Sequence, residues 1–178
     1  MATQFLRRFF APRSLVVIGA SPKPESTGGV VLQNLLLAGF PGPIWAVNPR
    51  GYKEVHGVAC FRRIADLPET PDLAIICSPL HGVPEVLEKL GARQVRAALI
   101  VSGGASLGEG AEALAGSRGE GSLRARLQKA TLQSGMRVLG PECLGVAVPS
   151  MRLNATYASQ PIGDGSVAYL GQSGMLGN

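Results

Sequence analysis

Short apolar runs alternate with stretches of helical spacing along most of the chain, and this alternation is the main evidence for the fold. Apolar runs predict strands at residues 14–19, 43–48, 72–77, 96–101 and 137–139. Helical spacing and good helix formers predict helices at residues 1–10, 27–40, 81–90 and 122–134. The predicted strands lack polar–apolar alternation, which is typical of strands covered on both faces. The pattern therefore predicts right-handed βαβ units in a Rossmann-like, doubly wound parallel sheet of the α/β class.

The same pattern begins again near the end of the sequence. Residues 149–165 have the composition of a linker, and residues 166–170 (SVAYL) predict a new strand that runs into a glycine-containing turn. A single strand and turn cannot form a stable sheet by themselves. We therefore expect a first domain at residues 1–148 and a linker at residues 149–165. Residues 166–178 would be the truncated first strand and turn of a second α/β domain.

Composition narrows the choice of ligand. The chain of 178 residues is 46% hydrophobic and 16% charged, which indicates a sizeable core. Its net charge of +5 comes mostly from arginine, and the densest basic spots are only pairs such as Arg7-Arg8 and Arg62-Arg63. Aromatic residues do not interleave with these pairs, as they do in many nucleic-acid-binding domains. A small polyanionic ligand is the better interpretation, because arginine binds phosphates through its planar fork.

Cysteine usage and hydropathy indicate a cytoplasmic protein without a membrane span. The three cysteines form no CxxC pair and only two histidines are present, so we expect no metal site. Unpatterned thiols are typical of a reducing compartment. No apolar run reaches the length of a membrane span, and residues 1–10 predict a short amphipathic helix rather than a signal peptide.

The turn after the first predicted strand is the first candidate binding element. In a doubly wound sheet, ligands bind at the carboxyl ends of the strands, and the first strand–helix turn commonly holds phosphates. Glycines let the backbone approach a ligand, and a helix amino terminus offers free N–H groups to an anion. The glycines could also do no more than shape a tight turn and a helix cap. The candidate residues are Gly19, Ala20, Ser21, Lys23, Ser26, Thr27, Gly28 and Gly29.

The turn after the second predicted strand favours a phosphorylated ribose. A domain that binds NAD has an acidic residue there to hold the ribose 2′-hydroxyl, whereas this chain has Asn48, Pro49 and Arg50. An arginine can pair with a ribose phosphate. The candidates are the 2′-phosphate of NADP and the 3′-phosphate of coenzyme A (CoA). Arg50 could also be an ordinary exposed charge.

Two further turns follow the third and fourth predicted strands and would reach the same sheet edge. They supply Ser78 and Pro79, and Ser102, Gly103 and Gly104. His81 follows the first of them, but no acid or nucleophile is placed to partner it, so we expect it in the first turn of a helix. We expect no catalytic residues in this chain.

An ordered set of short motifs carries a family resemblance over nearly the whole sequence. The set comprises SLVVIGAS at 14–21 with PKP and GG after it, VNP at 47–49, LP and PDLA at 67–74, GP and CLG at 140–145, LNAT at 153–156, and GSVAYLGQSG at 165–174. Together these motifs resemble the start of NDP-forming acyl-CoA synthetases, which are related to the α subunit of succinyl-CoA synthetase. They are also similar to the synthetase-like region of large bacterial protein lysine acetyltransferases, which carry a GNAT domain.

The resemblance implies that the first domain binds CoA or acyl-CoA. The loop at residues 19–29 would lie along the CoA phosphates and residues 48–50 near the nucleotide end. Residues 78–79 and 102–104 would line the pantetheine path. The turn Gln172, Ser173 and Gly174 would open a helix of a flavodoxin-like second domain, facing a phosphorylated histidine. One departure is Glu142, where the family usually has asparagine.

The resemblance also implies which parts the intact protein would add. Neither His56 nor His81 matches the phosphohistidine motif, so this chain alone would not carry out the transfer. ATP or ADP with magnesium would belong only to the intact parent, whose remaining domains are the expected partners, with a homo-oligomer possible. Three functions remain open: a CoA-binding part of a synthetase, a CoA-sensing region of a GNAT-fused acetyltransferase, and an NADP-binding domain of a reductase.

Overall fold

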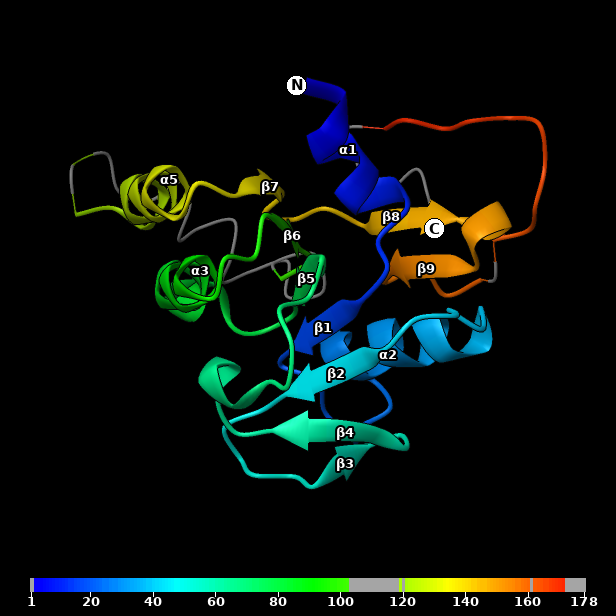
Figure 1. The fold of residues 1–178 in the computed structure, drawn as a ribbon, viewed down its shortest axis with the longest axis horizontal. Helices are drawn as coiled ribbons and strands as arrows, with labels where there is room; N and C mark the ends of the chain where they lie inside the picture. Colours follow the sequence, from blue (N-terminus) through cyan, green and yellow to red (C-terminus); the bar gives the residue numbers. More distant parts are fainter. Residues whose placement is uncertain (1, 103–118, 120, 161, 172–178) are drawn as a thin grey trace.

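A seven-stranded sheet forms the centre of the computed structural model, which describes residues 2–102, 119, 121–160 and 162–171 (Figure 1). The strand order is β3-β4-β2-β1-β5-β6-β7. All neighbouring strands in it are parallel except β3 and β4. The strands are β1 (Leu15–Ile18), β2 (Ile44–Val47), β3 (Glu54–Val55), β4 (Val58–Phe61), β5 (Leu73–Ile76), β6 (Ala97–Ile100) and β7 (Arg137–Leu139).

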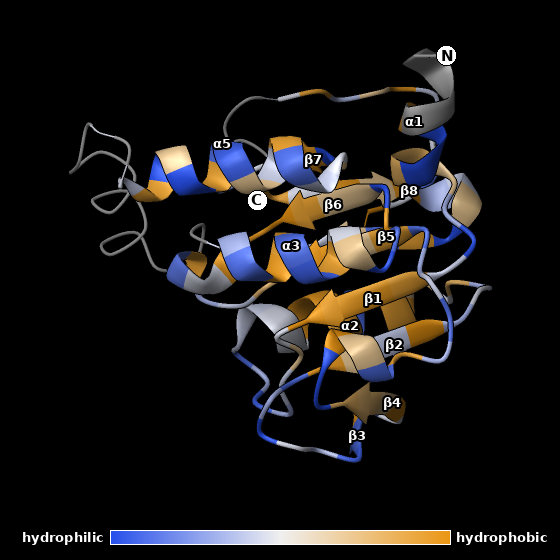
Figure 2. Ribbon diagram, turned by 60° about the vertical axis from the view of Figure 1, so that its left-hand side comes forward, coloured by the Kyte–Doolittle hydropathy of each residue, from blue (hydrophilic) through white to orange (hydrophobic). Residues whose placement is uncertain are grey.

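The central strands are apolar along their whole length because both faces of the sheet are covered. All four residues of β1, β5 and β6 are buried. In Figure 2 these strands are almost uniformly hydrophobic, whereas the helices change from hydrophobic to hydrophilic around their axes. Parallel sheets have this character because their crossover helices lie on the two faces. The predicted α/β class and Rossmann-like parallel sheet are confirmed.

Alternate residues of β1 enter two separate hydrophobic cores. Val16 and Ile18 belong to the core beneath α3 (Val83–Ala92) and α5 (Leu123–Ser134). Leu15 and Val17 belong to the core on the other face. That face is covered by α2 (Thr27–Leu37), by a hairpin and by α1 (Ala2–Phe10), whose Phe9 is buried in this core (Figure 1). Short 3₁₀ turns complete the connections at Ile64–Asp66, Leu80–Gly82 and Pro149–Met151.

Serine and glycine fix the ends of two covering helices. Ser26 caps α2, and Ser122 caps α5 by accepting a hydrogen bond from the N–H of Ala125 at 3.2 Å. Such caps satisfy N–H groups that have no partner inside the helix. Helix α5 ends at Gly135, which has a left-handed φ of 65°. Glycine adopts this conformation without the steric cost of a Cβ and is therefore common at the end of a helix.

The secondary structure differs from the prediction in the last third of the chain. The predicted linker contains a strand, β9 (Leu153–Thr156), which pairs in antiparallel fashion with β8 (Gly145–Val148). All four residues of β9 are buried, because its apolar residues enter the core beside α2 and its polar residues are hydrogen-bonded.

The segment at residues 166–170 differs as well. The structure gives it no strand, and its side chains are exposed, up to 98% at Leu170. A strand at the start of a sheet needs neighbouring strands, and none reaches this segment in the described part of the chain. Its assignment to a second domain, and the domain boundaries themselves, stay predictions.

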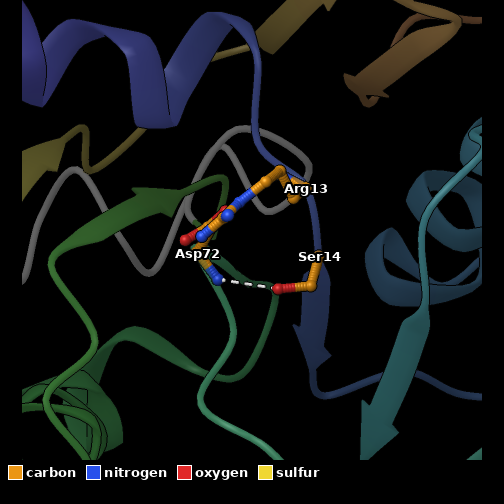
Figure 3. Close-up of polar contacts among 3 residues, drawn as sticks. All are labelled: Arg13, Ser14 and Asp72. Atoms are coloured by element: carbon orange, nitrogen blue, oxygen red, sulfur yellow. Dashed lines mark hydrogen bonds and ion pairs between the residues drawn. The ribbon is translucent and has the colours of Figure 1, made fainter.

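A small polar cluster joins the amino ends of β1 and β5 (Figure 3). The backbone N–H of Arg13 donates to a carboxylate oxygen of Asp72 at 3.0 Å, and the N–H of Asp72 donates to the hydroxyl of Ser14 at 3.1 Å. The guanidinium of Arg13 also reaches Asp72, but it is 91% exposed, so the ion pair itself contributes little. The cluster fixes the end of the sheet opposite to the carboxyl edge.

The described helices are all short, and none combines the length and apolar character that a membrane crossing requires.

Asn34 on α2 fixes the hairpin to the domain, and its loss should destabilise the fold. Its side-chain amide donates to the carbonyl oxygens of Thr156 at 2.9 Å and Ala158 at 3.0 Å. Asn34→Ala would leave both buried carbonyls without this donor, and we expect a loss of about 2 kcal/mol in the free energy of unfolding. Urea denaturation measures this loss. Gln33→Ala is the control, and equal effects of the two variants would contradict the role of Asn34.

Candidate functional site

The turns after four neighbouring strands meet at the carboxyl edge of the sheet. Strands β2, β1, β5 and β6 are adjacent and parallel, so the turns that follow them lie side by side in this order. Neighbouring strands are about 4.8 Å apart. An extended ligand could therefore contact all four turns in sequence. This is the edge at which the sequence predicts the site.

Gly19 lets the turn after β1 lie directly against the turn after β5. Its N–H donates to the carbonyl oxygen of Val47 at 2.8 Å, and its φ is +87°. A methyl group at Gly19 would lie 2.8 Å from the backbone nitrogen of Ser78, closer than a Cβ can approach. Any other residue would push the two turns apart or strain the backbone.

The start of α2 packs closely against the turn after β1. A methyl group at Gly28 would collide with the carbonyl oxygen of Gly19, and one at Gly29 would lie 2.8 Å from the hydroxyl of Ser26. The hydroxyl of Ser26 accepts from the N–H of Gly29 at 3.1 Å and donates to the carbonyl of Lys23 at 2.7 Å. The glycines and Ser26 therefore do shape the turn and the cap, which was the alternative interpretation.

This structural role leaves other groups of the turn for a ligand. The first N–H groups of a helix, here those of Thr27 and Gly28, have no partner within it. They lie at the positive end of the helix dipole, which attracts anions. A depression of about 410 Å³ opens beside them and is lined by Lys23, Pro24, Glu25 and Ser26. Ser21 is buried and its hydroxyl accepts from the N–H of Lys23, so its role is to shape the loop.

Asn48 joins the turns after β1 and β2. It is buried, and its side-chain amide donates to the carbonyl oxygen of Ala20 at 2.6 Å. Its side-chain oxygen accepts from the N–H of Arg50 at 3.0 Å. Both ends of the Asn48 side chain are thus used inside the protein. Pro49 and Arg50 are exposed, and no ion pair of Arg50 occurs among the described residues.

Ser78 has the one buried hydroxyl that lacks a partner in the described part of the chain. It lies beside Gly19, and the adjacent Pro79 is exposed. An unsatisfied buried hydroxyl is costly unless a ligand or a water completes it. Ser102 differs, because its hydroxyl donates to the carbonyl of Ile76 at 3.1 Å and so holds the end of β6. The predicted residues Gly103, Gly104, Gln172, Ser173 and Gly174 lie outside the described residues.

Two buried thiols lie behind the turns and are unsuited to catalysis. Burial raises the pKa of Cys77 strongly, and the neighbouring Cys143 adds to this effect. Burial also raises the pKa of Cys143, whose thiol donates to the carbonyl of Ile100 at 3.4 Å. Both thiols are therefore protonated at neutral pH, and a protonated thiol is a poor nucleophile.

Glu142 occupies the turn that follows β7. Its φ is +61°, a left-handed conformation that carries a cost of about 1 kcal/mol or more for a residue other than glycine or asparagine. Its N–H donates to the carbonyl of Ser102 at 3.2 Å, and its side chain is exposed. The backbone therefore fixes this turn to β6 although asparagine is absent.

The remaining candidates lie elsewhere or fail to form a site. His56 and His81 are exposed, and no group of three metal-ligating side chains occurs among the described residues. A second depression, of about 430 Å³, lies between the ends of α3 and α5, at the amino edge of the sheet and away from the four turns.

Arg62 belongs to the region of the site although the sequence did not predict it. It follows β4, which is parallel to β2, so it emerges at the same edge. A methyl group at Gly51 would lie 2.8 Å from Nε of Arg62. The only signal in the sequence was the basic pair Arg62-Arg63, which gives no indication of its place in the fold.

Comparison with known proteins identifies the family of the chain. The family model described as "CoA binding domain" matches residues 13–149. The chain is 34% identical over 171 residues to acetate–CoA ligase [ADP-forming] I of Archaeoglobus fulgidus, covering 95% of this chain and 23% of that protein. It is 35% identical over 177 residues to the α subunit of acetate–CoA ligase [ADP-forming] I of Pyrococcus furiosus, covering 97% and 36%.

A solved structure of a protein with a related name is also similar to this chain over nearly its whole length. Acetyl-coenzyme A synthetase 1 of Ca. Korarchaeum cryptofilum, in complex with phosphate and ADP, superposes with a TM-score of 0.82 at 34% identity. The match covers 97% of this chain and 35% of that protein chain. The sequence thus spans only about a quarter to a third of the length of these relatives.

Replacing Gly19 should distort the site and destabilise the fold. Gly19→Ala adds a Cβ against the backbone of Ser78 at a position where φ is +87°, and we expect a loss of about 2 kcal/mol in the free energy of unfolding. Gly82→Ala is the control, because a methyl group at Gly82 meets nothing within 4 Å. Denaturant unfolding of both variants measures the difference. A Gly19→Ala variant as stable as the control would contradict the close approach.

Proposed function

Because this chain belongs to the CoA binding domain family, we propose that the four turns at the carboxyl edge of its sheet hold CoA in an extended form. The domain is homologous to the N-terminal part of NDP-forming acyl-CoA synthetases. The proposal adds which residues bind each part of the ligand and what the domain contributes to a larger protein.

The proposed direction of the ligand combines the strand order with the type of group present at each turn. The adenosine with its 3′-phosphate lies at the turn after β2, next to Pro49 and Arg50. The diphosphate lies at the start of α2, where the N–H groups of Thr27 and Gly28 and the charge of Lys23 attract it. Pantetheine then passes Ser78 and the end of β6 at Ser102. This order follows from β2, β1, β5 and β6 being consecutive in the sheet.

The unpartnered hydroxyl of Ser78 is the observation that carries the placement. This hydroxyl is buried without a partner among the described residues, so a polar group of a ligand could complete its hydrogen bonding. Pantetheine contains two amides, which can donate or accept such a hydrogen bond. The other buried polar side chains at this edge, those of Asn48 and Ser102, are already partnered within the domain.

The parent protein, on this proposal, is an NDP-forming acyl-CoA synthetase. The relatives named above are ligases or their subunits, and this supports the synthetase over a GNAT-fused acetyltransferase. The present residues would bind CoA and orient its thiol. The phosphorylated histidine, ATP or ADP with magnesium, and the acyl-group chemistry would belong to further domains. Residues 166–178, with the turn Gln172, Ser173 and Gly174, would begin the first of these, a flavodoxin-like domain.

The binding step performed by this chain requires no nucleophile of its own. The described thiols at the edge are buried with raised pKa values, so they would not compete with the thiol of CoA for an acyl group. The turns fix the ligand at several points along its length, and this restricts the motion of the thiol at its end.

Calorimetric titration at one fixed salt concentration tests the proposed ligand. We expect CoA to bind, 3′-dephospho-CoA to bind about tenfold more weakly because Arg50 loses a charged partner, and ADP to bind more weakly still. Binding of NADP without binding of CoA would contradict the proposal and indicate a reductase domain.

Ser78→Ala tests the placement of pantetheine separately from stability. Removing a hydroxyl that has no partner should leave the free energy of unfolding unchanged within about 0.5 kcal/mol. We expect the affinity for CoA to fall about fivefold, because the ligand loses one hydrogen bond of about 1 kcal/mol. Ser150→Ala, at an exposed position, is the control. Unchanged affinity in the Ser78→Ala variant would show that pantetheine takes another path.

A further inference from the structure

The guanidinium of Arg62 is held against the turn that follows β2. A methyl group built at Gly51 would lie 2.8 Å from Nε, 3.1 Å from Cζ and 3.2 Å from one terminal nitrogen of Arg62. The planar head of Arg62 therefore lies over the α-carbon of Gly51, in space that a side chain at Gly51 would fill. Gly51 directly follows Arg50, so the guanidinium of Arg62 lies beside the turn that carries Arg50.

Strand pairing brings Arg62 to this turn. Phe61, the last residue of β4, is paired with Val47, the last residue of β2, in a parallel register. The N–H of Asn48 also donates to the carbonyl of Phe61 at 2.9 Å. The chains leaving β2 and β4 therefore start from the same level of the sheet, and Arg62 emerges next to the turn at residues 48–51.

The positive charge of Arg62 is not neutralised within the described part of the chain, whereas that of its neighbour is. Arg63 forms two hydrogen bonds to the carboxylate of Asp66, at 2.7 and 3.0 Å, and this contact lowers the pKa of Asp66. No ion pair of Arg62 or Arg50 occurs among the described residues. Arg63 is therefore engaged within the protein, whereas the charge of Arg62 is available to a ligand.

We propose that Arg62 and Arg50 together bind the phosphate monoester on the ribose of CoA. The inference rests on the proposed function and names a residue that specifies the phosphorylated form of the ligand. A phosphate monoester carries close to two negative charges at neutral pH and has three acceptor oxygens. A guanidinium on the turn after β2 and one beside that turn can both donate hydrogen bonds to these oxygens. Holding Arg62 over Gly51 reduces the side-chain freedom lost on binding.

The test compares Arg62→Ala with Arg63→Ala in the 178-residue chain. Both variants remove one exposed arginine from adjacent positions, so they change the overall charge equally. Calorimetric titrations with CoA and with 3′-dephospho-CoA are run at one salt concentration. We expect Arg62→Ala to weaken CoA binding about tenfold and to leave the binding of 3′-dephospho-CoA within about twofold. Arg63→Ala should change either affinity by less than about twofold.

Arg62→Lys distinguishes geometry from charge. Lysine keeps the positive charge but lacks the planar fork, so we expect its CoA affinity to lie between those of the wild type and Arg62→Ala. Thermal melting of each variant checks that the fold is retained, as expected for exposed positions.

Each other outcome has a definite meaning. If Arg62→Ala lowers the affinities for CoA and 3′-dephospho-CoA equally, Arg62 contacts another part of the ligand. If Arg62→Ala and Arg63→Ala lower the affinity for CoA equally, Arg62 acts only through the overall charge. If the wild type binds CoA and 3′-dephospho-CoA equally, CoA binding stands but the phosphate site at Arg50 and Arg62 is wrong. If the wild type binds neither, the proposed function itself fails. Tighter binding of NADP than of CoA, lost in Arg62→Ala, would assign the arginine to a ribose 2′-phosphate.

Discussion

The close approach of three backbone segments at Gly19 is the constraint on which the carboxyl edge depends. The end of β1, the turn after β5 and the start of α2 meet there without any side chain between them. Asn48 extends this contact to the turn after β2 through its hydrogen bond to Ala20. A site for an extended ligand needs several turns at fixed spacing, and here that spacing is set by the backbone contacts and one buried amide.

The binding edge and the opposite edge of the sheet are stabilised by different means. At the amino edge, backbone N–H groups and the side chains of Ser14 and Asp72 form hydrogen bonds with one another. At the carboxyl edge, the hydroxyl of Ser78 and the charges of Arg50 and Arg62 are left without partners in the described residues. Polar groups that folding leaves unsatisfied next to one another are candidates for binding a ligand.

The sequence predicts the order of strands and helices well, because this order follows from the local pattern of apolar residues. Apolar runs and capping residues predict β1, β2, β5, β6, α2 and α5 close to their observed positions. The pattern fails for β9, where the buried side chains of Asn154 and Thr156 bond to each other and the carbonyl of Thr156 accepts from Asn34, more than 100 residues away. It also fails for Arg62, whose place is fixed by the pairing of β4 with β2 and by the absence of a side chain at Gly51.

The residues predicted as binding residues have two different roles in the structure. Some hold the turns in place, and others are available to a ligand. Ser26, Asn48 and Ser102 were predicted as binding residues, yet their side chains are engaged within the domain. A hydrogen bond already made contributes to the position of the turns, and breaking it to bind a ligand would offset much of the gain. On the proposed function, affinity and specificity would therefore depend on groups that folding leaves free. Among the described residues these include the first N–H groups of α2, the hydroxyl of Ser78 and the guanidinium groups of Arg50 and Arg62.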